Sequence, residues 1–177
     1  VSMEIPECVR VVQVPEDVMA SISPMQTPQG ALFLCRLPEK APFVPKPGML
    51  LLDGIQDPGN LGTILRTADA LEVPVALLEG CADPYSHKTV RASMGAVFRS
   101  GVWTAQAREM KAVLERSGIP LYGAALRDDT LDARDVDYSR SALAIGSEGR
   151  GLSEEMLLLC DKTIRIPMGA RCESLNA

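Results

Sequence analysis

Short apolar runs alternate with amphipathic stretches along the chain from Gly48 onward. The runs are rich in Leu, Val, Ile and Ala, which is typical of strands that are buried on both faces. The stretches between them place apolar residues three or four positions apart, as helices that pack on a sheet do. The predicted strands are residues 49–52, 73–78, 97–103, 119–125, 142–145 and 163–166, and the predicted helices are residues 61–71, 87–94, 105–117 and 154–160. This alternation predicts an α/β fold with a mostly parallel sheet covered on both faces.

The N-terminal part of the chain has a weaker pattern. Residues 9–14 and 31–36 are strand-like, and a helix is predicted near residues 16–22. The next stretch carries prolines at positions 38, 42, 45 and 47, and proline at that density fits neither a helix interior nor a central strand. We therefore expect a domain boundary here, with residues 1–37 before a linker at 38–48 and the main domain at 49–177.

Composition narrows this picture. Aromatic residues make up only 4% of the 177 residues, so the core must consist mostly of aliphatic side chains. The formal charge of −5 counts against binding of long nucleic-acid duplexes, although a net charge says little about one cleft. The five cysteines are scattered without a C-x-x-C pair, which disfavours a zinc site or a disulfide framework and favours a reducing cytoplasm. The apolar runs are too short to cross a bilayer, so no membrane partner is expected.

Ligands of a parallel sheet bind beyond the carboxyl ends of its strands, so the loops that follow the strands form the candidate site. In the first of these loops, Asn60 suits the N-cap of a helix, while Gly59 and Gly62 leave room for a close approach to the backbone. Arg66 then lies opposite the apolar stripe of that helix and is a candidate phosphate-binding residue. The alternative is that Arg66 pairs with Asp69 on a solvated surface and Asn60 merely caps the helix.

Two further loops have unusual sequences. The loop at 146–151 contains three glycines but neither the G-x-G-x-x-G dinucleotide motif nor a P-loop. Glu148 would repel a pyrophosphate and better suits a ligand with cationic or hydroxyl groups, and the alternative is a tight turn with a solvated Glu148. The loop at 167–176 carries Ser174 and Asn176 where a helix should begin, and ordinary capping by Ser174 is the alternative there.

Other common sites are not indicated. His87 is the only histidine and lies in a polar run, so it is predicted on the surface and a Ser–His–Asp triad is not expected. No cluster of His, Cys and Asp has the spacing of metal ligands. Residues 128–137 are acidic and predict a solvated loop.

Three stretches, taken in order, carry a resemblance to a known family. The stretches Asn60-Leu-Gly-Thr-Ile-Leu-Arg66, Gly146-Ser-Glu-Gly-Arg-Gly151, and Ile166-Pro-Met-Gly with Ser174-Leu-Asn176 closely resemble the three signature motifs of the SpoU (TrmH-like) RNA 2′-O-ribose methyltransferases of the SPOUT superfamily. The resemblance covers roughly Gly48 to the end. It implies a SPOUT-type α/β fold with a C-terminal trefoil knot, and a homodimer. Residues 1–37 look like the end of the small RNA substrate-binding domain that is common in this family.

The resemblance also implies an activity and a site. The implied reaction is methyl transfer from S-adenosylmethionine, without a metal, to a ribose 2′-hydroxyl of a structured ribosomal or transfer RNA. Arg66 looks like the catalytic arginine, with Asn60, Glu148, Ser174 and Asn176 around it. The residues that look like cofactor contacts are Gly146, Ile166, Leu175, Met168 and Ala124.

Two other functions compete with this one. The first is a catalytically silent RNA-binding paralogue, which the joint presence of the five implied catalytic residues disfavours. The second is a nucleotide-dependent oxidoreductase, which the absence of the dinucleotide motif disfavours. Members of the family continue past the Ser-Leu-Asn motif into a helix that completes the knot. We therefore expect the sequence from Val1 to Ala177 to be part of a longer protein.

Overall fold

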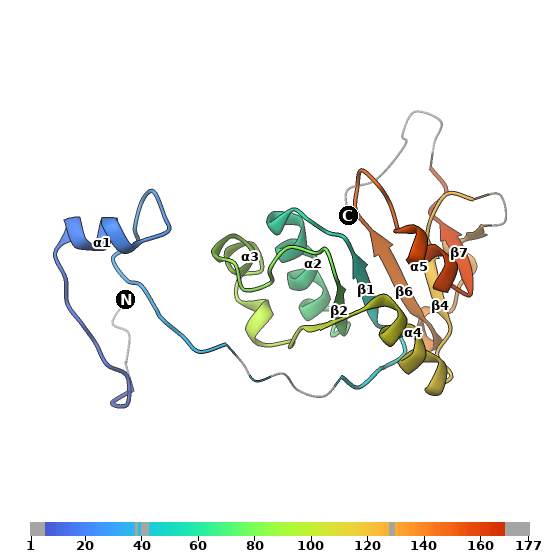
Figure 1. The fold of residues 1–177 in the computed structure, drawn as a ribbon, viewed down its shortest axis with the longest axis horizontal. Coiled ribbons are helices and arrows are strands. Elements are labelled where there is room, and N and C mark those ends of the chain that lie inside the picture. The colour runs from blue at the N-terminus through green and yellow to red at the C-terminus, as the bar shows by residue number, and fades with distance from the viewer. Residues whose placement is uncertain (1–5, 38, 40–42, 128–129, 169–177) are drawn as a thin grey trace. The chain divides into compact units, whose positions relative to one another are not determined.

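The computed structural model describes residues 6–37, 39, 43–127 and 130–168, and the chain divides into two units, Val1–Leu37 and Pro38–Ala177 (Figure 1). In the first unit, helix α1 (Glu16–Ile22) confirms the helix predicted there. The strand-like stretches 9–14 and 31–36 are not strands, and the described part of this unit offers them neither a partner strand nor a buried residue to pack on. Apolar alternation alone does not form a strand without a ladder of hydrogen bonds to a neighbour.

In its described residues, the second unit is built on a parallel sheet of seven strands in the order β3-β2-β1-β6-β4-β7-β5. The strands are β1 (Leu50–Asp53), β2 (Val75–Leu78), β3 (Trp103–Ala105), β4 (Leu121–Ala124), β5 (Leu131–Asp132), β6 (Ala142–Gly146) and β7 (Lys162–Arg165). Because every pairing is parallel, the carboxyl ends of all the strands lie along one edge. At the middle of that edge, Asp53 of β1 is in register with Gly146 of β6.

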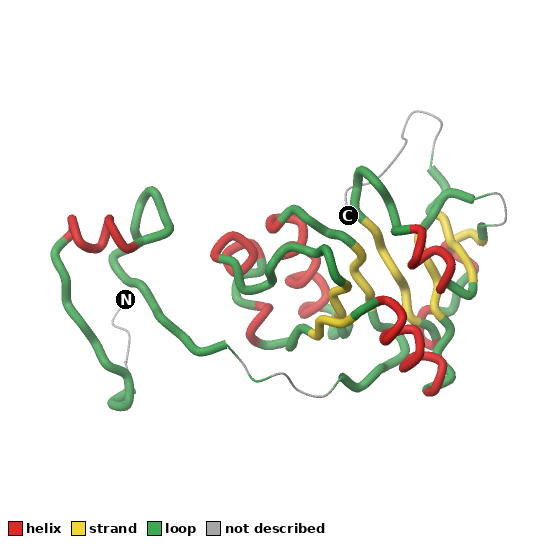
Figure 2. The backbone as a smooth tube through the Cα atoms, viewed as in Figure 1, coloured by secondary structure: helices red, strands yellow, loops and turns green. Residues whose placement is uncertain are grey.

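Helices cover both faces of the sheet (Figure 2). These helices are α2 (Pro58–Ala70), α3 (His87–Ala92), α4 (Ala107–Arg116) and α5 (Glu154–Leu159). Leu52 of β1 packs in one apolar cluster with Leu61 and Leu65 of α2, whereas Leu51 packs in a second cluster with Leu114 of α4. Successive residues of a strand point to opposite faces, so a strand covered on both sides has to be apolar at consecutive positions. The predicted two-sided α/β architecture is confirmed.

Two predicted segments differ from the structure. The apolar run at 97–103 is not one strand, because Ala96–Phe98 forms a 3-10 helix and β3 begins only at Trp103. Left-handed backbone at Gly95 (φ 80°) and Gly101 (φ 64°) interrupts the extended conformation on both sides of Phe98.

The acidic segment 128–137 is also more ordered than predicted. Its described part contains β5 and a 3-10 helix at Ala133–Asp135, rather than only a solvated loop. Asp132 accepts hydrogen bonds from the backbone N–H and the guanidinium of Arg134, so its charge caps the 3-10 helix. The guanidinium beside it lowers the pKa of Asp132 to about 2.

Candidate functional site

The loops that follow β1 and β6 are joined at the carboxyl edge of the sheet. The side-chain amide of Asn60 donates a hydrogen bond to Oε1 of Glu148, across 88 residues of sequence. The backbone N–H of Ser153 donates to Oδ2 of Asp53 over 2.7 Å. The predicted convergence of these two loops is therefore present in the structure.

The loop from Gly146 to Gly151 is closed on itself by its own backbone. Ser147 N–H donates to the carbonyl of Gly151 over 3.1 Å, and Gly151 N–H donates back to the carbonyl of Ser147 over 2.7 Å. A Cβ on Gly146 would lie 2.0 Å from the carbonyl carbon of Gly151, so only glycine fits there. Glu148 is carried at the exposed tip of this closed turn, where it reaches Asn60.

Helix α2 begins three residues earlier than the sequence interpretation placed it. Asp57 is the N-cap, and its Oδ1 accepts the backbone N–H of Asn60 over 2.8 Å. Pro58 occupies the first helical position, where its missing N–H costs nothing. The prediction that Asn60 is the N-cap is therefore wrong, and the Asp-Pro pair is the signal that could have corrected it. Since Asp57 serves as the cap, the side chain of Asn60 is available to bond Glu148.

Arg66 lies on the exposed side of α2, opposite the buried Leu61 and Leu65. The alternative in which it pairs with Asp69 is wrong. Asp69 is bound by Arg99, with Nη2 of the guanidinium 2.5 Å from Oδ2, and by the hydroxyl of Ser100. These two groups hold the pKa of Asp69 below its ordinary value, with the Ser100 hydrogen bond as the larger cause. Within the described residues Arg66 makes no hydrogen bond or ion pair, so its guanidinium faces solvent.

Gly62 does not leave room for a ligand, which corrects the sequence interpretation. A Cβ at this position would lie 2.5 Å from Cβ of Ala92 and 2.7 Å from the carbonyl oxygen of Thr89. Both atoms belong to α3, so glycine at position 62 allows close packing of two helices. At Gly59 the nearest atom to such a Cβ would be Oδ1 of Asp57, at 2.9 Å, so the capping side chain takes that space too.

An open hollow of about 220 Å³ lies between the two joined loops. It is lined by Ile55, Gln56, Asp57, Asn60, Ser147, Glu148, Gly149 and Arg150. Most of these residues offer hydrogen-bonding groups, and one carboxylate and one guanidinium stand on the same loop. Such a lining suits a hydroxyl-bearing ligand such as a ribose better than an apolar one.

The remaining predicted cofactor residues lie along the same edge. Ala124 is the last residue of β4, Gly146 ends β6, and Ile166 directly follows β7. These three strands are neighbours in the sheet, in the order β6-β4-β7. Ile166 is 57% exposed and Met168 is 36% exposed, so apolar surface is present beside the strand ends.

Part of the predicted site lies outside the described residues. Ser174, Leu175 and Asn176 lie within 169–177, which the structure does not describe. Their predicted roles stay predictions. His87 lies on the surface at the first position of α3, as expected.

Asp53 is a site residue that the sequence interpretation missed. It is only 8% exposed, and its Oδ2 accepts the N–H of Ser153, the residue that caps α5. A buried carboxylate needs such a donor, and here the donor belongs to the loop that carries Glu148. The signal in the sequence was a single charged residue at the end of an apolar strand. Burial raises the pKa of the neighbouring thiol of Cys81, and the charge of Asp53 adds to this effect.

The described part of the chain shows neither a metal site nor a membrane-spanning helix. No group of three or more His, Cys, Asp or Glu side chains is arranged to hold a metal ion there. None of its helices has both the length and the apolar character needed to span a membrane.

Known proteins resemble this chain in sequence and in fold. The model of the SpoU rRNA methylase family matches residues 47–177. The 23S rRNA (guanosine(2553)-2′-O)-methyltransferase of Bacillus subtilis is 34% identical over 163 residues, which cover 91% of this chain and 65% of that protein. Among solved structures, a protein assigned to the TrmH family of RNA methyltransferases in Porphyromonas gingivalis has a TM-score of 0.84 at 39% identity, covering 99% of this chain and 72% of that one. An rRNA methyltransferase of Sinorhizobium meliloti with bound AdoMet has a TM-score of 0.71 at 34% identity, covering 78% of this chain and 56% of that one. The chain thus spans a little under two thirds of the Bacillus relative that it matches.

Proposed function

The chain belongs to the SpoU rRNA methylase family, and on that premise we propose that it transfers a methyl group from S-adenosylmethionine to a ribose 2′-hydroxyl of RNA. The contact between Asn60 and Glu148 carries the proposal. It joins the first two motifs of the family resemblance at the edge of the sheet where ligands of parallel sheets bind. Large-subunit ribosomal RNA is the first candidate substrate, because the Bacillus relative is named for it.

The strand ends suit the proposed methyl donor. Ala124 has a small side chain, so we propose that the backbone groups at the end of β4 bind the ligand together with those of the loop that packs against Gly146 at the end of β6. Ile166 and Met168 provide exposed apolar side chains for a purine ring or an aliphatic chain. When bound, S-adenosylmethionine supplies a methyl group already activated by its sulfonium, so no metal is needed for that step.

The acceptor hydroxyl must be aligned and partly deprotonated before it can attack the methyl group. A ribose hydroxyl is a poor nucleophile until its proton is drawn away, and catalysis then consists mainly of alignment for in-line attack. The exposed guanidinium of Arg66 is available for this task. Because arginine is normally too basic to accept a proton, Arg66 either is aided by an RNA phosphate in drawing the proton away or orients the hydroxyl without taking its proton. The hydrogen bond to Glu148 fixes the amide of Asn60, which we propose holds the ribose with Ser174 and Asn176.

The experiment is a methyl-transfer assay with labelled S-adenosylmethionine and unmodified 23S rRNA transcribed in vitro. Product sites are mapped by the resistance of 2′-O-methylated linkages to alkaline hydrolysis. We expect Arg66→Ala to lower kcat by at least about 100-fold, since it removes the alignment of the hydroxyl, while calorimetry shows unchanged affinity for S-adenosylmethionine. Arg116→Ala is the matched control, because Arg116 is another exposed helical arginine, in the last turn of α4. Full activity of a folded Arg66→Ala protein would show that the assignment is wrong.

The family resemblance also predicts a knot and a homodimer, and the scattered cysteines favour a cytoplasmic location. We include the homodimer in the proposal, and light scattering on the full-length protein tests it. We propose too that residues 1–37 belong to an RNA substrate-binding domain. Their division from the rest of the chain at Leu37 supports this proposal.

A further inference from the structure

Positive charge gathers on α3 in a chain that is acidic as a whole. The sequence has 23 acidic and 18 basic residues, yet no Asp or Glu occurs between Asp83 and Glu109. Within that stretch, α3 carries Lys88 and Arg91, both exposed. Exposed cations attract phosphates locally even when the net charge of the molecule is negative.

The helix α3 is held firmly beside the candidate site. Its backbone packs against Gly62 of α2, one helical turn from Arg66, so closely that no Cβ fits between them. The segment that leads into α3 is bonded to the first site loop, where Ala82 N–H donates to the carbonyl of Ile55 over 2.8 Å. The backbone of α3 therefore keeps a fixed position relative to the backbone of α2, which carries the proposed catalytic arginine.

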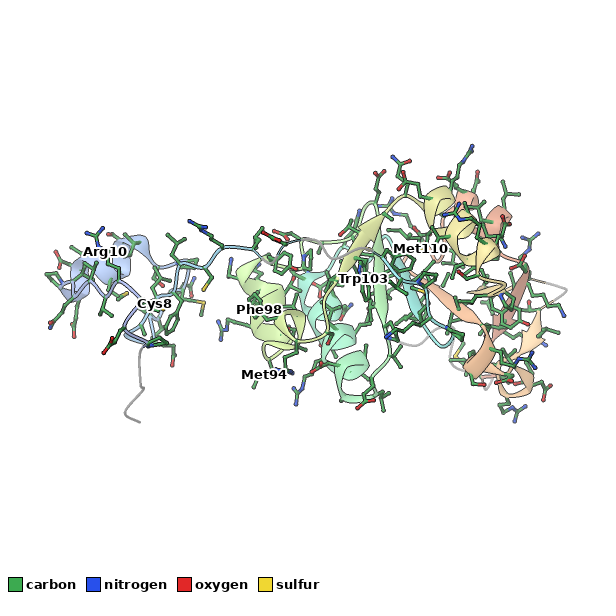
Figure 3. The ribbon with its side chains drawn as sticks, turned by 90° about the horizontal axis from the view of Figure 1, so that it is seen from below. Cys8, Arg10, Met94, Phe98, Trp103 and Met110 are labelled. Carbon is green, nitrogen blue, oxygen red and sulfur yellow. The ribbon has the colours of Figure 1, made fainter. Side chains whose placement is uncertain are left out.

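Two large apolar side chains are exposed directly after α3. Met94 is 68% exposed and Phe98 is 54% exposed, and Figure 3 labels both residues on this segment. Met94 also has a left-handed backbone, with φ of 51°, which is unfavourable for a side chain with a Cβ. A strained backbone and an exposed apolar side chain each cost free energy, and strained residues cluster at functional positions.

The ring of Phe98 has an aromatic neighbour, and the segment that carries it is anchored. The ring of Tyr85 lies next to it, with the two centroids 6.2 Å apart and the planes tilted by 30°. The next residue, Arg99, is anchored to Asp69 of α2, and Ser100 bonds the same carboxylate. Phe98 is thus a rigid, partly exposed aromatic platform, which is the kind of group on which unpaired RNA bases stack.

We propose that the α3 surface, defined as Lys88, Arg91, Met94 and Phe98, binds single-stranded RNA that flanks the target nucleotide. Lys88 and Arg91 contact phosphates, and an unpaired base stacks on Phe98 beside Met94. This inference rests on the proposed function, because it places the RNA strand next to Arg66. Scattered cations around isolated apolar groups suit a polyanion with stacking bases better than a second protein, which needs a continuous apolar core.

The test measures binding of a fluorescein-labelled single-stranded oligoribonucleotide of mixed sequence to the full chain. We expect Lys88→Glu to weaken binding by about tenfold and to reduce the slope of log K against log salt by about 0.7, the value for one phosphate contact on a single strand. Phe98→Ala should weaken binding by about tenfold with little change in that slope, and Phe98→Tyr should restore it. Arg116→Glu is the matched control, because it reverses a charge on α4, which packs in the other apolar cluster of the sheet.

Methylation kinetics separate this inference from the proposed function. In the variants we expect KM for 23S rRNA to rise about tenfold, while kcat at saturating RNA and the affinity for S-adenosylmethionine stay at the wild-type values. Equal RNA affinity of wild type, Lys88→Glu and Phe98→Ala would overturn the α3 surface and leave the proposed function standing. A wild-type protein that binds the oligoribonucleotide through these residues but methylates no RNA would overturn the proposed function alone. A change of oligomeric state in Lys88→Glu without loss of RNA binding would show instead that α3 contacts a second copy.

Discussion

Replacement of Gly146 by alanine tests whether backbone packing sets the shape of the loop that carries Glu148. The added Cβ would lie 2.0 Å from the carbonyl carbon of Gly151, 2.1 Å from its oxygen and 2.2 Å from the N of Leu152. All three are backbone atoms, so no side-chain rotation can relieve the overlap. A separation of 3.4 Å, the lower end of ordinary contact, requires a shift of about 1.4 Å by one of the two backbone segments.

A shift of that size breaks the closure of the loop. The two hydrogen bonds between Ser147 and Gly151, of 3.1 and 2.7 Å, cannot both survive it. Overpacking of this kind costs about 1–3 kcal/mol, and each lost hydrogen bond adds about 0.5–1.5 kcal/mol. We therefore expect Gly146→Ala to lose about 2–5 kcal/mol of stability, and its melting temperature to fall by at least about 5 °C.

The assays are thermal unfolding and calorimetric titration with S-adenosylmethionine. Because Gly146 is also a proposed cofactor contact, we expect affinity for S-adenosylmethionine to fall by at least about tenfold, or 1.4 kcal/mol. Gly149→Ala is the matched control in the same loop: no atom lies within 4 Å of its added Cβ, and its φ is not positive. We expect its stability to change by less than about 0.5 kcal/mol. If Gly146→Ala matched the control in both assays, the close backbone contact would not determine the shape of the loop.

Three further predictions concern other groups. Gly62→Ala should destabilise the protein by about 1–3 kcal/mol despite the better helix propensity of alanine, because its Cβ would overlap Ala92; an unchanged urea midpoint would contradict this. Asp53→Ala should cost about 1–3 kcal/mol by leaving the N–H of Ser153 without its acceptor, whereas Asp53→Asn keeps an oxygen there and should recover most of the loss; equal urea midpoints for the two variants would argue against this role. Burial raises the pKa of the Cys160 thiol from 9.0 to about 11, so the stability that it contributes is complete below pH 9 and is lost as the pH rises through 11. Iodoacetamide should accordingly label Cys160 slowly at neutral pH and faster near pH 11, as read by mass spectrometry, and rapid labelling at pH 7 would refute this.

Most of the fold could be predicted from the sequence because a doubly covered sheet leaves a plain pattern. Leu51 and Leu52 are both fully buried, one in each cluster, and only a strand covered on both faces requires this. The strand prediction failed where left-handed backbone interrupts an apolar run, as at Gly95. It also failed where the apolar run has no partner strand in the described residues, as at 31–36. Hydrophobic periodicity indicates which side chains can be buried. It does not indicate whether a neighbouring strand is present to form hydrogen bonds with the segment.

The candidate loops could be found from their place after the strands, but their internal geometry could not. The bond between Asp53 and Ser153 joins residues 100 positions apart, and the sequence alone does not indicate that these two residues pair. The pairing of Asp69 with Arg99, rather than with its helical neighbour Arg66, has the same origin. Spacing along the helix favours an ion-pair partner that is near in sequence, whereas the folded chain brings a partner from another element.

The glycines of the two motifs show what the family signature requires physically. A glycine in such a motif suggests space for a ligand, yet Gly62 and Gly146 are both filled by another part of the backbone. Their lack of a side chain brings α3 against α2 and folds the turn at 146–151 onto the end of β6. These close contacts in turn position Asn60, Glu148 and Arg66, whose side chains carry the proposed chemistry. It follows that a variant can lose activity at either glycine with every proposed catalytic side chain intact, and that unfolding and kinetics must be measured together to tell the two kinds of loss apart.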